Sequence, residues 1–534
     1  MKKNNAFRRA AALIAALSIT VSLAAPAFAD TYYIDYGDIT ITKNEDGSQT
    51  IEQGGDKWTD KAGEETVITT SNTVITTLES DLEGPAAEDS DFGPVVEDNY
   101  QSAQPESTEE SEDADQPEIA EEPKSADRQE SADQQAAPAA APAGSAPVNK
   151  KDDGFWGNTI TVINNIADKV LNLTLKDVKI DVSDTGDQYD WDQKGKAALS
   201  VQGKGNVEIE LDGDNELKSG TQSAGLEKTS TGTLTLKDDN NEAGSLTATG
   251  GFNSAGIGGG YLGDGKNITI TGGTVTATGG SSGAGIGGGR EGKGENITIT
   301  GGTVNATGNE DGAGIGGGSS GSGENITIND GKVTATGGSY AAGIGGGSVG
   351  AWGGDAGSGK NITINGGTVN ATGTDGGAGI GGGENGNGED ITITGGEVKA
   401  TGGANGAGIG GDGGSGGSNV TVSGAAQVTA TAGKGSRYAG AGATIGGGGS
   451  STQDSDGNTV PTPGTEIQAD IKGLTTGYIH HIIYEQDGTT IKREWWEPVR
   501  PQPTPALSAP ASMWKRWRAT PCPLTPSSRA APCG

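Results

Sequence analysis

The sequence is poor in the residues that usually hold a secreted or globular domain together. Its two cysteines, Cys522 and Cys533, lie near the C-terminal end, so no disulfide framework can staple the long body before them. Aromatic residues make up 4% of the chain and hydrophobic residues 31%, which is less than a layered globular core needs. Stability must therefore come from backbone ladders and from stacking.

Signals for catalysis are also scarce. The only histidines, His480 and His481, are adjacent in an expected strand, so they should face opposite sides of it. No G-x-S-x-G motif occurs, and the glycine runs lack the helix start and the Lys-Ser/Thr pair that a phosphate loop needs. A chain of near-identical repeats gives arrays instead of one unique acid–base cluster. The sequence therefore predicts a protein that is not an enzyme.

Positive charge is scarce as well. The net charge is −34, and about half of it falls in residues 81–130. No basic stripe occurs before the C-terminal region, which argues against nucleic acid and anionic membranes as partners.

The first 29 residues have the features of a secretory signal peptide. Lys2, Lys3, Arg8 and Arg9 precede an apolar run over 10–25, and Ala27-Phe28-Ala29 offers an A-x-A cleavage site. The run is too short for a stable membrane span, and no later segment is long enough to insert into a bilayer. We therefore expect a secreted, extracellular protein that is either released or associated with the cell surface.

The dominant feature is an internal repeat. The phrase "NITITGGTVTATGG" begins at Asn267, and each of its copies is followed by a variant of "AGIGG". Successive isoleucines of "AGIGG" are 29 or 36 residues apart, and Leu226 in "SAGLEK" resembles a degenerate earlier copy. These isoleucines are Ile257, Ile286, Ile315, Ile344, Ile380, Ile409 and Ile445. A period of this length indicates a solenoid, in which each unit hides its core by stacking on its neighbours.

Each repeat predicts one coil of a parallel β-helix. "NITIT" and "TVTAT" alternate as strands do, a Gly-Gly corner joins them, and "AGIGG" supplies a third, shorter strand. The residues expected to point inward are Ile268, Ile270, Val275, Ala277 and Ile286. Those expected to point outward are Asn267, Thr269, Thr271, Thr274, Thr276 and Thr278. Stacking about ten such coils at one strand spacing of ~4.8 Å gives a solenoid about 45 Å long.

One outward position is threonine in six copies and predicts a polar ladder along the solenoid. Its members are Thr278, Thr307, Thr336, Thr372, Thr401 and Thr431. Hydroxyl groups repeated at every strand spacing can hydrogen-bond a polysaccharide laid along them. The first five are therefore candidate carbohydrate-binding residues. An ice-binding face also uses threonine ladders, but side chains such as Lys332 and Glu397 roughen this one.

Three aromatic residues at two places in the chain are candidate anchors for a sugar ring. Tyr189 and Trp191 lie in the acidic loop "DVSDTGDQYDWDQKGK", and Trp352 lies in a seven-residue insertion between repeats. Asp187, Asp190 and Asp192 in the same acidic loop offer oxygen ligands for Ca²⁺, although their spacing fits no fixed calcium motif. A solvated acidic loop is the alternative interpretation.

Composition divides the chain into six parts. A signal peptide (1–29) is followed by a short β-rich segment (30–80), a disordered acidic Pro/Ala-rich linker (81–150) and the β-helix (151–464). Residues 465–499 form a C-terminal cap or a small β module. Residues 500–534 are a basic, proline-rich tail, expected to be disordered, which is either a native linker or the product of a frameshift or truncation.

One long stretch of the sequence resembles secreted carbohydrate-binding β-helix proteins of clostridia and related bacteria. It begins with "AALSVQGKGNVEIELDGDNELKSGTQSAGLEKTSTGTLTL" and continues through "SLTATGGFNSAGIGGG" and its repeats. The resemblance covers roughly residues 155–450. It implies an all-β, right-handed parallel β-helix related in fold to pectate lyases. It further implies non-catalytic binding of cellulose or acidic pectic sugars, with calcium bound in some members.

We therefore expect a secreted carbohydrate-binding or adhesion protein whose partner is a plant cell-wall or host polysaccharide. A structural cell-surface stalk is the closest alternative. A polysaccharide lyase would need a unique basic and acidic cluster on one face of the solenoid, and the sequence shows none.

Overall fold

The computed structural model describes residues 30–70, 148–240, 242–350 and 353–498. These residues all belong to one compact unit, and the one helical element among them is a short 3-10 turn, η1 (Ile34–Tyr36). No helix in the described ranges has the length and apolar character that a bilayer crossing requires. The expected signal peptide, the linker up to residue 147 and the tail from residue 500 lie outside the described residues.

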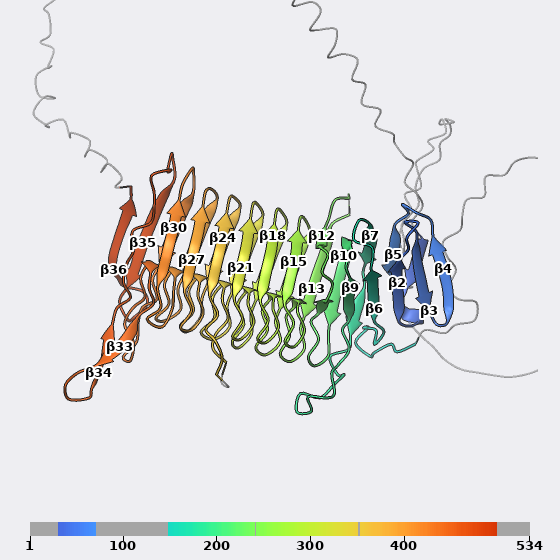
Figure 1. Ribbon diagram of the computed structural model, residues 1–534, viewed down its shortest axis with the longest axis horizontal. Coiled ribbons are helices and arrows are strands. Elements are labelled where there is room, and N and C mark those ends of the chain that lie inside the picture. Colours follow the sequence, from blue (N-terminus) through green and yellow to red (C-terminus); the bar gives the residue numbers. More distant parts are fainter. Residues whose placement is uncertain (1–29, 71–147, 241, 351–352, 499–534) are drawn as a thin grey trace, which may run out of the picture. The chain divides into compact units, whose positions relative to one another are not determined.

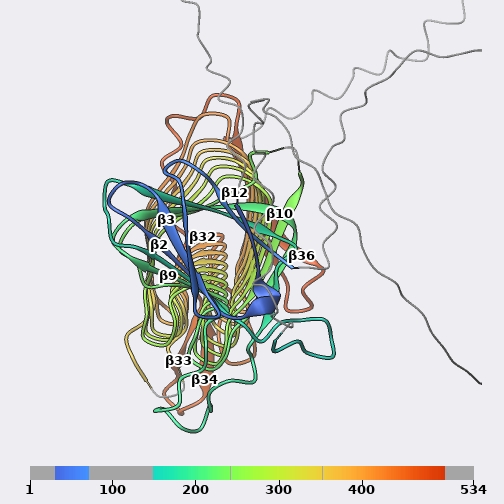
Figure 2. The ribbon, with the colours of Figure 1, turned by 90° about the vertical axis from the view of Figure 1, so that its right-hand side faces the viewer.

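Each repeat forms one coil of three strands. In one coil these are β15 (Gly265–Ile270), β16 (Thr274–Thr278) and β17 (Ile286–Gly287), with the Gly272-Gly273 corner between the first two. Each strand pairs in parallel with its counterpart in the next coil, 29 residues later for β15 and β18, so three parallel sheets wind around one core. Figure 1 shows the strands of successive coils side by side, and Figure 2 shows the coils one behind another. This is the right-handed parallel β-helix that the sequence predicted.

Sheet 1 contains the "NITIT" strands. Its members, in order, are β5 (Thr66–Thr69), β7 (Val170–Lys176), the first half of β10 (Asn206–Lys218), β12 (Leu234–Lys237), β15, β18 (Gly294–Ile299), β21 (Gly323–Ile328), β24 (Gly359–Ile364), β27 (Gly388–Ile393) and β30 (Gly417–Val422). Strand β1 (Asp30–Tyr33) pairs with β5.

Sheet 2 contains the "TVTAT" strands. Its parallel members are β8 (Lys179–Asp181), the second half of β10, β13 (Gly244–Thr249), β16, β19 (Thr303–Thr307), β22 (Lys332–Thr336), β25 (Thr368–Thr372), β28 (Glu397–Thr401), β31 (Gln427–Thr431) and β35 (Tyr478–Tyr484).

Sheet 3 contains the short "IG" strands. Its parallel members are β2 (Ile39–Lys43), β6 (Ile160–Asn164), β9 (Leu199–Gly203), β11 (Leu226–Lys228), β14 (Ile257–Gly258), β17, β20 (Ile315–Gly316), β23 (Ile344–Gly345), β26 (Ile380–Gly381), β29 (Ile409–Gly410) and β32 (Ile445–Gly446). Leu226 pairs with Ile257, which confirms the degenerate early copy.

The core consists of stacked aliphatic side chains. The five residues expected to point inward, from Ile268 to Ile286, are all fully buried, whereas Thr274 is exposed and the other outward residues are partly exposed. The inward and outward assignment is therefore confirmed. Each coil covers the apolar rows of its two neighbours, which is why so thin a core can exclude water.

Glycine follows each "AGI" for a steric reason. At Gly287 the backbone φ is +138°, and an added Cβ would come within 1.9 Å of the carbonyl oxygen of Gly316 in the next coil. Only glycine combines this backbone conformation with such a close approach between coils. The glycines of "IGG" are therefore a packing requirement of sheet 3.

Asparagine opens each "NITIT" strand for two structural reasons, its backbone conformation and its side-chain hydrogen bonds. Asn267, Asn296, Asn325 and Asn361 all have φ near +56°, in the left-handed region that asparagine tolerates well. The Nδ2 of Asn296, Asn325 and Asn361 each donates to the Oδ1 of the preceding asparagine over 2.9–3.2 Å, which builds an asparagine ladder across these coils. Asp390 holds the next position and has no amide to donate to Asn361, so the ladder is interrupted there; it resumes in the following coil, where Asn419 Nδ2 donates to Asp390 Oδ1 over 3.0 Å.

Antiparallel strands close both ends of the stack. At the N-terminal end β3 (Gln49–Gln53) and β4 (Asp56–Asp60) follow β2 in antiparallel order. At the C-terminal end β36 (Ile491–Glu497) pairs antiparallel with β35, through a turn at Gly488. A smaller hairpin joins β33 (Ser450–Gln453) and β34 (Thr459–Thr462). Turning the last strand back in this way ends the parallel series that would otherwise invite a further strand.

The two histidines lie in the C-terminal closure as the alternation predicts. His481 is buried and stacks on Trp495 with ring centroids 4.4 Å apart, whereas His480 is partly exposed and stacks on Trp496 at 3.9 Å. The Nδ1 of His481 lies 2.7 Å from the hydroxyl of Thr444, which donates to the Oε2 of Glu466 over 2.9 Å. Because Thr444 is fully buried, this trio fastens the closure to the last coil.

Candidate functional site

Two exposed aromatic side chains sit on the loop over residues 183–194. Tyr189 is 84% exposed and Trp191 is 50% exposed, although both have large apolar rings. The ring of Trp191 lies 5.2 Å from that of Tyr261, and the backbone carbonyl of Trp191 accepts from Gln222 Nε2 over 3.3 Å. Lys194 anchors the end of this loop through a 2.9 Å ion pair with the buried Glu227. The loop is thus held against the coils with its rings toward solvent.

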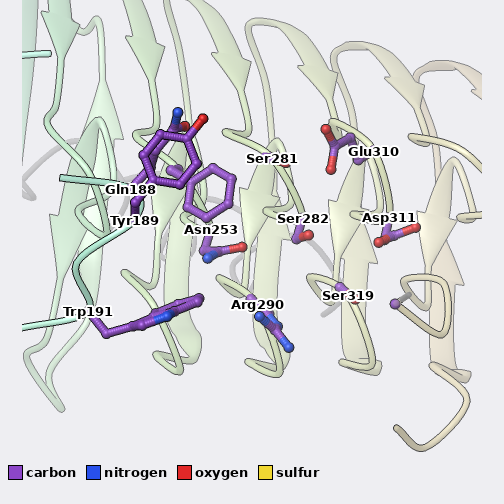
Figure 3. Close-up of a pocket in the computed structure, with 12 residues that line it drawn as sticks. Gln188, Tyr189, Trp191, Asn253, Ser281, Ser282, Arg290, Glu310, Asp311 and Ser319 are labelled. Carbon is purple, nitrogen blue, oxygen red and sulfur yellow. The ribbon is translucent and has the colours of Figure 1, made fainter. Parts of the chain in front are cut away.

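Beside this loop lies a groove of about 440 Å³, which we call the aromatic groove. Figure 3 shows Tyr189 and Trp191 at one end, Glu310 and Asp311 at the other, and serines, Asn253 and Arg290 between them. Its lining residues are Gln188, Tyr189, Trp191, Phe252, Asn253, Ser281, Ser282, Arg290, Glu310, Asp311, Ser319 and Gly350. Loops of several successive coils contribute to it, so the groove runs along the solenoid.

Backbone hydrogen bonds between loops build the floor of the groove. The amide of Arg290 donates to the carbonyl of Asn253 over 3.0 Å, and the amide of Ser319 donates to that of Ser282 over 2.8 Å. Asn253 and Ser282 both have φ near +65°, a conformation that places the loop in a tight turn. The loops before and after each "IG" strand are therefore joined coil by coil, which makes the groove a rigid surface.

Charges in the groove are of both signs. Asp311 is half-buried, and its pKa is raised above the ordinary value, mainly by burial and further by Glu310 and Glu384, while Arg290 opposes the rise. The guanidinium of Arg290 is largely buried and lies 3.5 Å from the carboxylate of the exposed Glu291. Carboxylate and guanidinium groups make charge-assisted hydrogen bonds to hydroxyl groups, and aromatic rings offer flat apolar faces. This combination suits a ligand that is rich in hydroxyls and has one apolar face.

The expected calcium ligands do not converge. Asp187 Oδ1 accepts from the amide of Tyr189, and Asp190 accepts from the amide of Asp192 and from the side chain of Gln193. These are local turn contacts that hold the loop. Within the described residues no three His, Cys, Asp or Glu side chains are grouped to hold a metal, and calcium binding by Asp187, Asp190 and Asp192 stays a prediction.

The threonine ladder forms as predicted, but most of it lies away from the cavities. Thr278, Thr307, Thr336, Thr372 and Thr401 are consecutive partners in sheet 2. Thr401 lines a cavity of about 400 Å³ near the C-terminal end, and none of the five lines the aromatic groove. The third aromatic candidate, Trp352, lies outside the described residues, although Gly350 from the same insertion lines the groove.

A buried acid occupies a glycine position. In six copies the third glycine after the isoleucine is retained, as in Gly289 and Gly383, but the corresponding residue after Ile409 is Asp412. Its side chain is 1% exposed, and its Oδ2 has no hydrogen-bond partner among the described residues. Burial, with a smaller effect of Glu384, raises the pKa of Asp412 to about 7.

Sequence reasoning identified Tyr189 and Trp191 but missed the polar half of the groove. Nothing in the sequence connects Arg290 or Asp311 with Tyr189, because their loops are 100 or more residues away from it. One signal was available, since each replaces a small or neutral residue at an equivalent loop position of another repeat, as Asp311 replaces Ser282. Asp412 could have been found in the same way, as the one break in a glycine column.

Comparison with known proteins agrees with the stacked coils. Six stretches match the family model described as the beta helix repeat: residues 242–261, 268–290, 297–319, 326–348, 362–384 and 391–417. No curated protein matches the chain, and no solved structure does. The matched stretches lie within the part of the solenoid that runs from β13 to β30. This chain is therefore a repeat protein with the parallel β-helix fold, and six of its stretches match the beta helix repeat.

Proposed function

We propose that this chain is an exported, non-catalytic protein that binds polysaccharide in the aromatic groove. The observation that carries the proposal is the groove itself, in which two exposed rings face a row of serine, asparagine, arginine and carboxylate groups. Ring faces pack against the C–H surface of a sugar while the polar groups bond its hydroxyls. The resemblance of the repeats to clostridial carbohydrate-binding β-helix proteins supports the same ligand class.

The charges favour a neutral polysaccharide over a polyanionic one. The chain carries a net charge of −34, and the groove holds Glu310 and Asp311 against the single cation of Arg290. A polyuronate would meet repulsion both at long range and in the groove. We therefore rank neutral hydroxyl-rich chains above the acidic pectic sugars.

Affinity electrophoresis of the full chain tests this proposal. Gels would contain hydroxyethylcellulose, xylan, mannan or polygalacturonate, and retardation by at least one neutral polymer is expected. Trp191→Ala and Arg290→Ala should reduce the retardation about tenfold or more, since each removes a group with a contact of about 1.4 kcal/mol or larger. Val148→Ala, which changes an exposed side chain outside the groove, is the matched control.

A third variant separates the groove from the threonine ladder. Thr307→Ala removes an exposed hydroxyl from the middle of the ladder on sheet 2. If Thr307→Ala abolishes retardation and Trp191→Ala does not, the ligand lies along the ladder and the groove assignment is wrong. Ultraviolet absorbance of unsaturated products, measured on the same polymers, would reveal lyase activity and contradict the non-catalytic part of the proposal.

A structural stalk is the second candidate. The regular asparagine ladder and the mutually supporting coils favour it, because both serve stiffness without any ligand. Absence of retardation by every polymer, with circular dichroism showing a folded β protein, would favour the stalk over the binding function.

A further inference from the structure

The aromatic groove is not an isolated depression, because it lies on an edge of the solenoid that is continuous over many coils. This edge is formed by the loops that connect sheet 2 to sheet 3, and we call it the loop edge. Its loops cover residues 250–256, 279–285, 308–314, 337–343, 373–379, 402–408 and 432–444. Equivalent backbone bonds tie them together, for example Gly280 N to Ser254 O over 2.8 Å and Gly403 N to Gly377 O over 2.8 Å.

A second pair of cavities lies at the other end of the loop edge. One of about 400 Å³ is lined by Asp375, Thr401, Ala404 and Lys434, among others, and one of about 450 Å³ adjoins it. The two cavities share Lys434 and Tyr484, so they are adjacent, and together we call them the distal groove. Lys434 comes from the last loop of the edge, and Tyr484 ends strand β35 of the closing hairpin.

An exposed tyrosine lies between the two grooves. Tyr340 occupies the same position in its loop as Asn253, Ser282 and Asp311 of the aromatic groove, four residues before the isoleucine of "AGIGG". It has the same left-handed backbone conformation as Asn253 and Ser282, and its side chain is 45% exposed. The loop edge thus presents rings or polar side chains from one groove to the other.

We propose that the two grooves and Tyr340 form a single track for one polysaccharide chain, so that ligand length decides affinity. This inference rests on the proposed function of the aromatic groove and adds a second contact region to it. From the loop of Asn253 to the loop of Lys434 the solenoid advances by six coils, from Ile257 to Ile445. At ~4.8 Å per coil the two loops are about 29 Å apart along the axis.

A ligand that reaches both grooves gains from the second contact without a new encounter from solution. Once the aromatic groove holds one end, the other end samples the distal groove at a high effective concentration. Chains shorter than about 29 Å can occupy only one groove at a time. Affinity should therefore rise steeply, by about 10²-fold, when the ligand becomes long enough to span the track.

The test measures affinity against ligand length for the full chain. Isothermal titration would use cello-, xylo- and manno-oligosaccharides from the disaccharide upward, together with their soluble parent polymers. We expect the ratio of long-chain to short-chain affinity to be about 10² in the unaltered protein and in Val148→Ala. Tyr484→Ala should reduce this ratio toward one. Lys434→Ala changes an exposed loop residue and should act in the same direction if Tyr484→Ala fails to fold.

The possible results distinguish failure of the track from failure of the proposed function of the aromatic groove. If Trp191→Ala weakens binding but affinity rises smoothly with length in the unaltered protein, the aromatic groove binds sugar and the track is refuted. A step that survives both Lys434→Ala and Tyr484→Ala also refutes the track. If no oligosaccharide or polymer of the three series binds, both the track and the proposed function are wrong.

Discussion

Replacing Asp412 by glycine should make the protein more stable at neutral pH. Six of the seven copies have glycine here, and the carboxyl of Asp412 is buried with its Oδ2 unpartnered among the described residues. Burial raises its pKa from 3.8 to about 7. Between about pH 4 and pH 7 the carboxyl of Asp412 thus keeps its proton in the folded protein, whereas in the unfolded chain it has lost it. The free energy of unfolding therefore falls as pH rises from about 4 to about 7.

The size of the expected gain in stability follows from the pKa shift of Asp412. About three pKa units at 1.36 kcal/mol each give a ceiling of about 4 kcal/mol, reached above pH 7. Over roughly 350 residues the unfolding entropy is about 0.7 kcal/mol/K, so the change corresponds to about 5 °C in Tm. Below pH 4, where the carboxyl is neutral in both states, the variant should differ little from the unaltered protein.

Thermal melts followed by circular dichroism at pH 4, 6 and 8 provide the measurement. The difference in Tm between Asp412→Gly and the unaltered protein should grow with pH over this range. Asp375→Ala is the matched control, since it removes an acid from an exposed loop position and leaves the buried carboxyl of Asp412 in place. A constant difference for Asp412→Gly, or lower stability at pH 8, would refute the assignment of a neutral buried acid.

Three further perturbations test the fold. Ile315→Asp places a carboxylate in the fully buried row of sheet 3 and should lower the free energy of unfolding by about 4 kcal/mol in denaturant titrations. Thr307→Asp on the outer face should lower it by less than about 1 kcal/mol. Similar losses for the two variants would reject the inward and outward assignment. Asp390→Asn supplies a side-chain amide that can donate to Asn361 Oδ1 and extend the asparagine ladder by one bond. The free energy of unfolding should rise by about 1 kcal/mol, and a fall would contradict the ladder. His481, whose pKa burial lowers to about 4, should loosen the C-terminal closure as pH falls from 6.5 to 4, seen as a change in tryptophan fluorescence that is absent in His481→Phe.

Periodicity was sufficient to predict the coil and its core. Ile268, Val275 and Ile286 recur with their neighbours at a fixed interval, and strand alternation alone assigns them to the inside. The reason is that a solenoid coil touches only the coils next to it, so its contacts repeat with the sequence. The asparagine of "NITIT" was visible but not understood, because its left-handed backbone and its ladder appear only when equivalent residues are stacked.

The aromatic groove was predicted only in part. The exposed rings of Tyr189 and Trp191 were visible as local departures from the repeat, but their partners Arg290 and Asp311 lie in other coils. Sequence gives no distance between loops of different coils until the register of the sheets and the path of each loop are known. The same holds for the closing trio of Thr444, Glu466 and His481.

By itself the sequence determined the all-β class, the parallel stacking, the coil length and the identity of the core rows, because each depends on a local period that every copy repeats. The tertiary structure decided which loop side chains share a groove, that Asp187, Asp190 and Asp192 do not converge, and that Asp412 is buried without a partner for its Oδ2 among the described residues. These features belong to the irregular positions, where a side chain's environment is supplied by neighbouring coils and not by its own repeat.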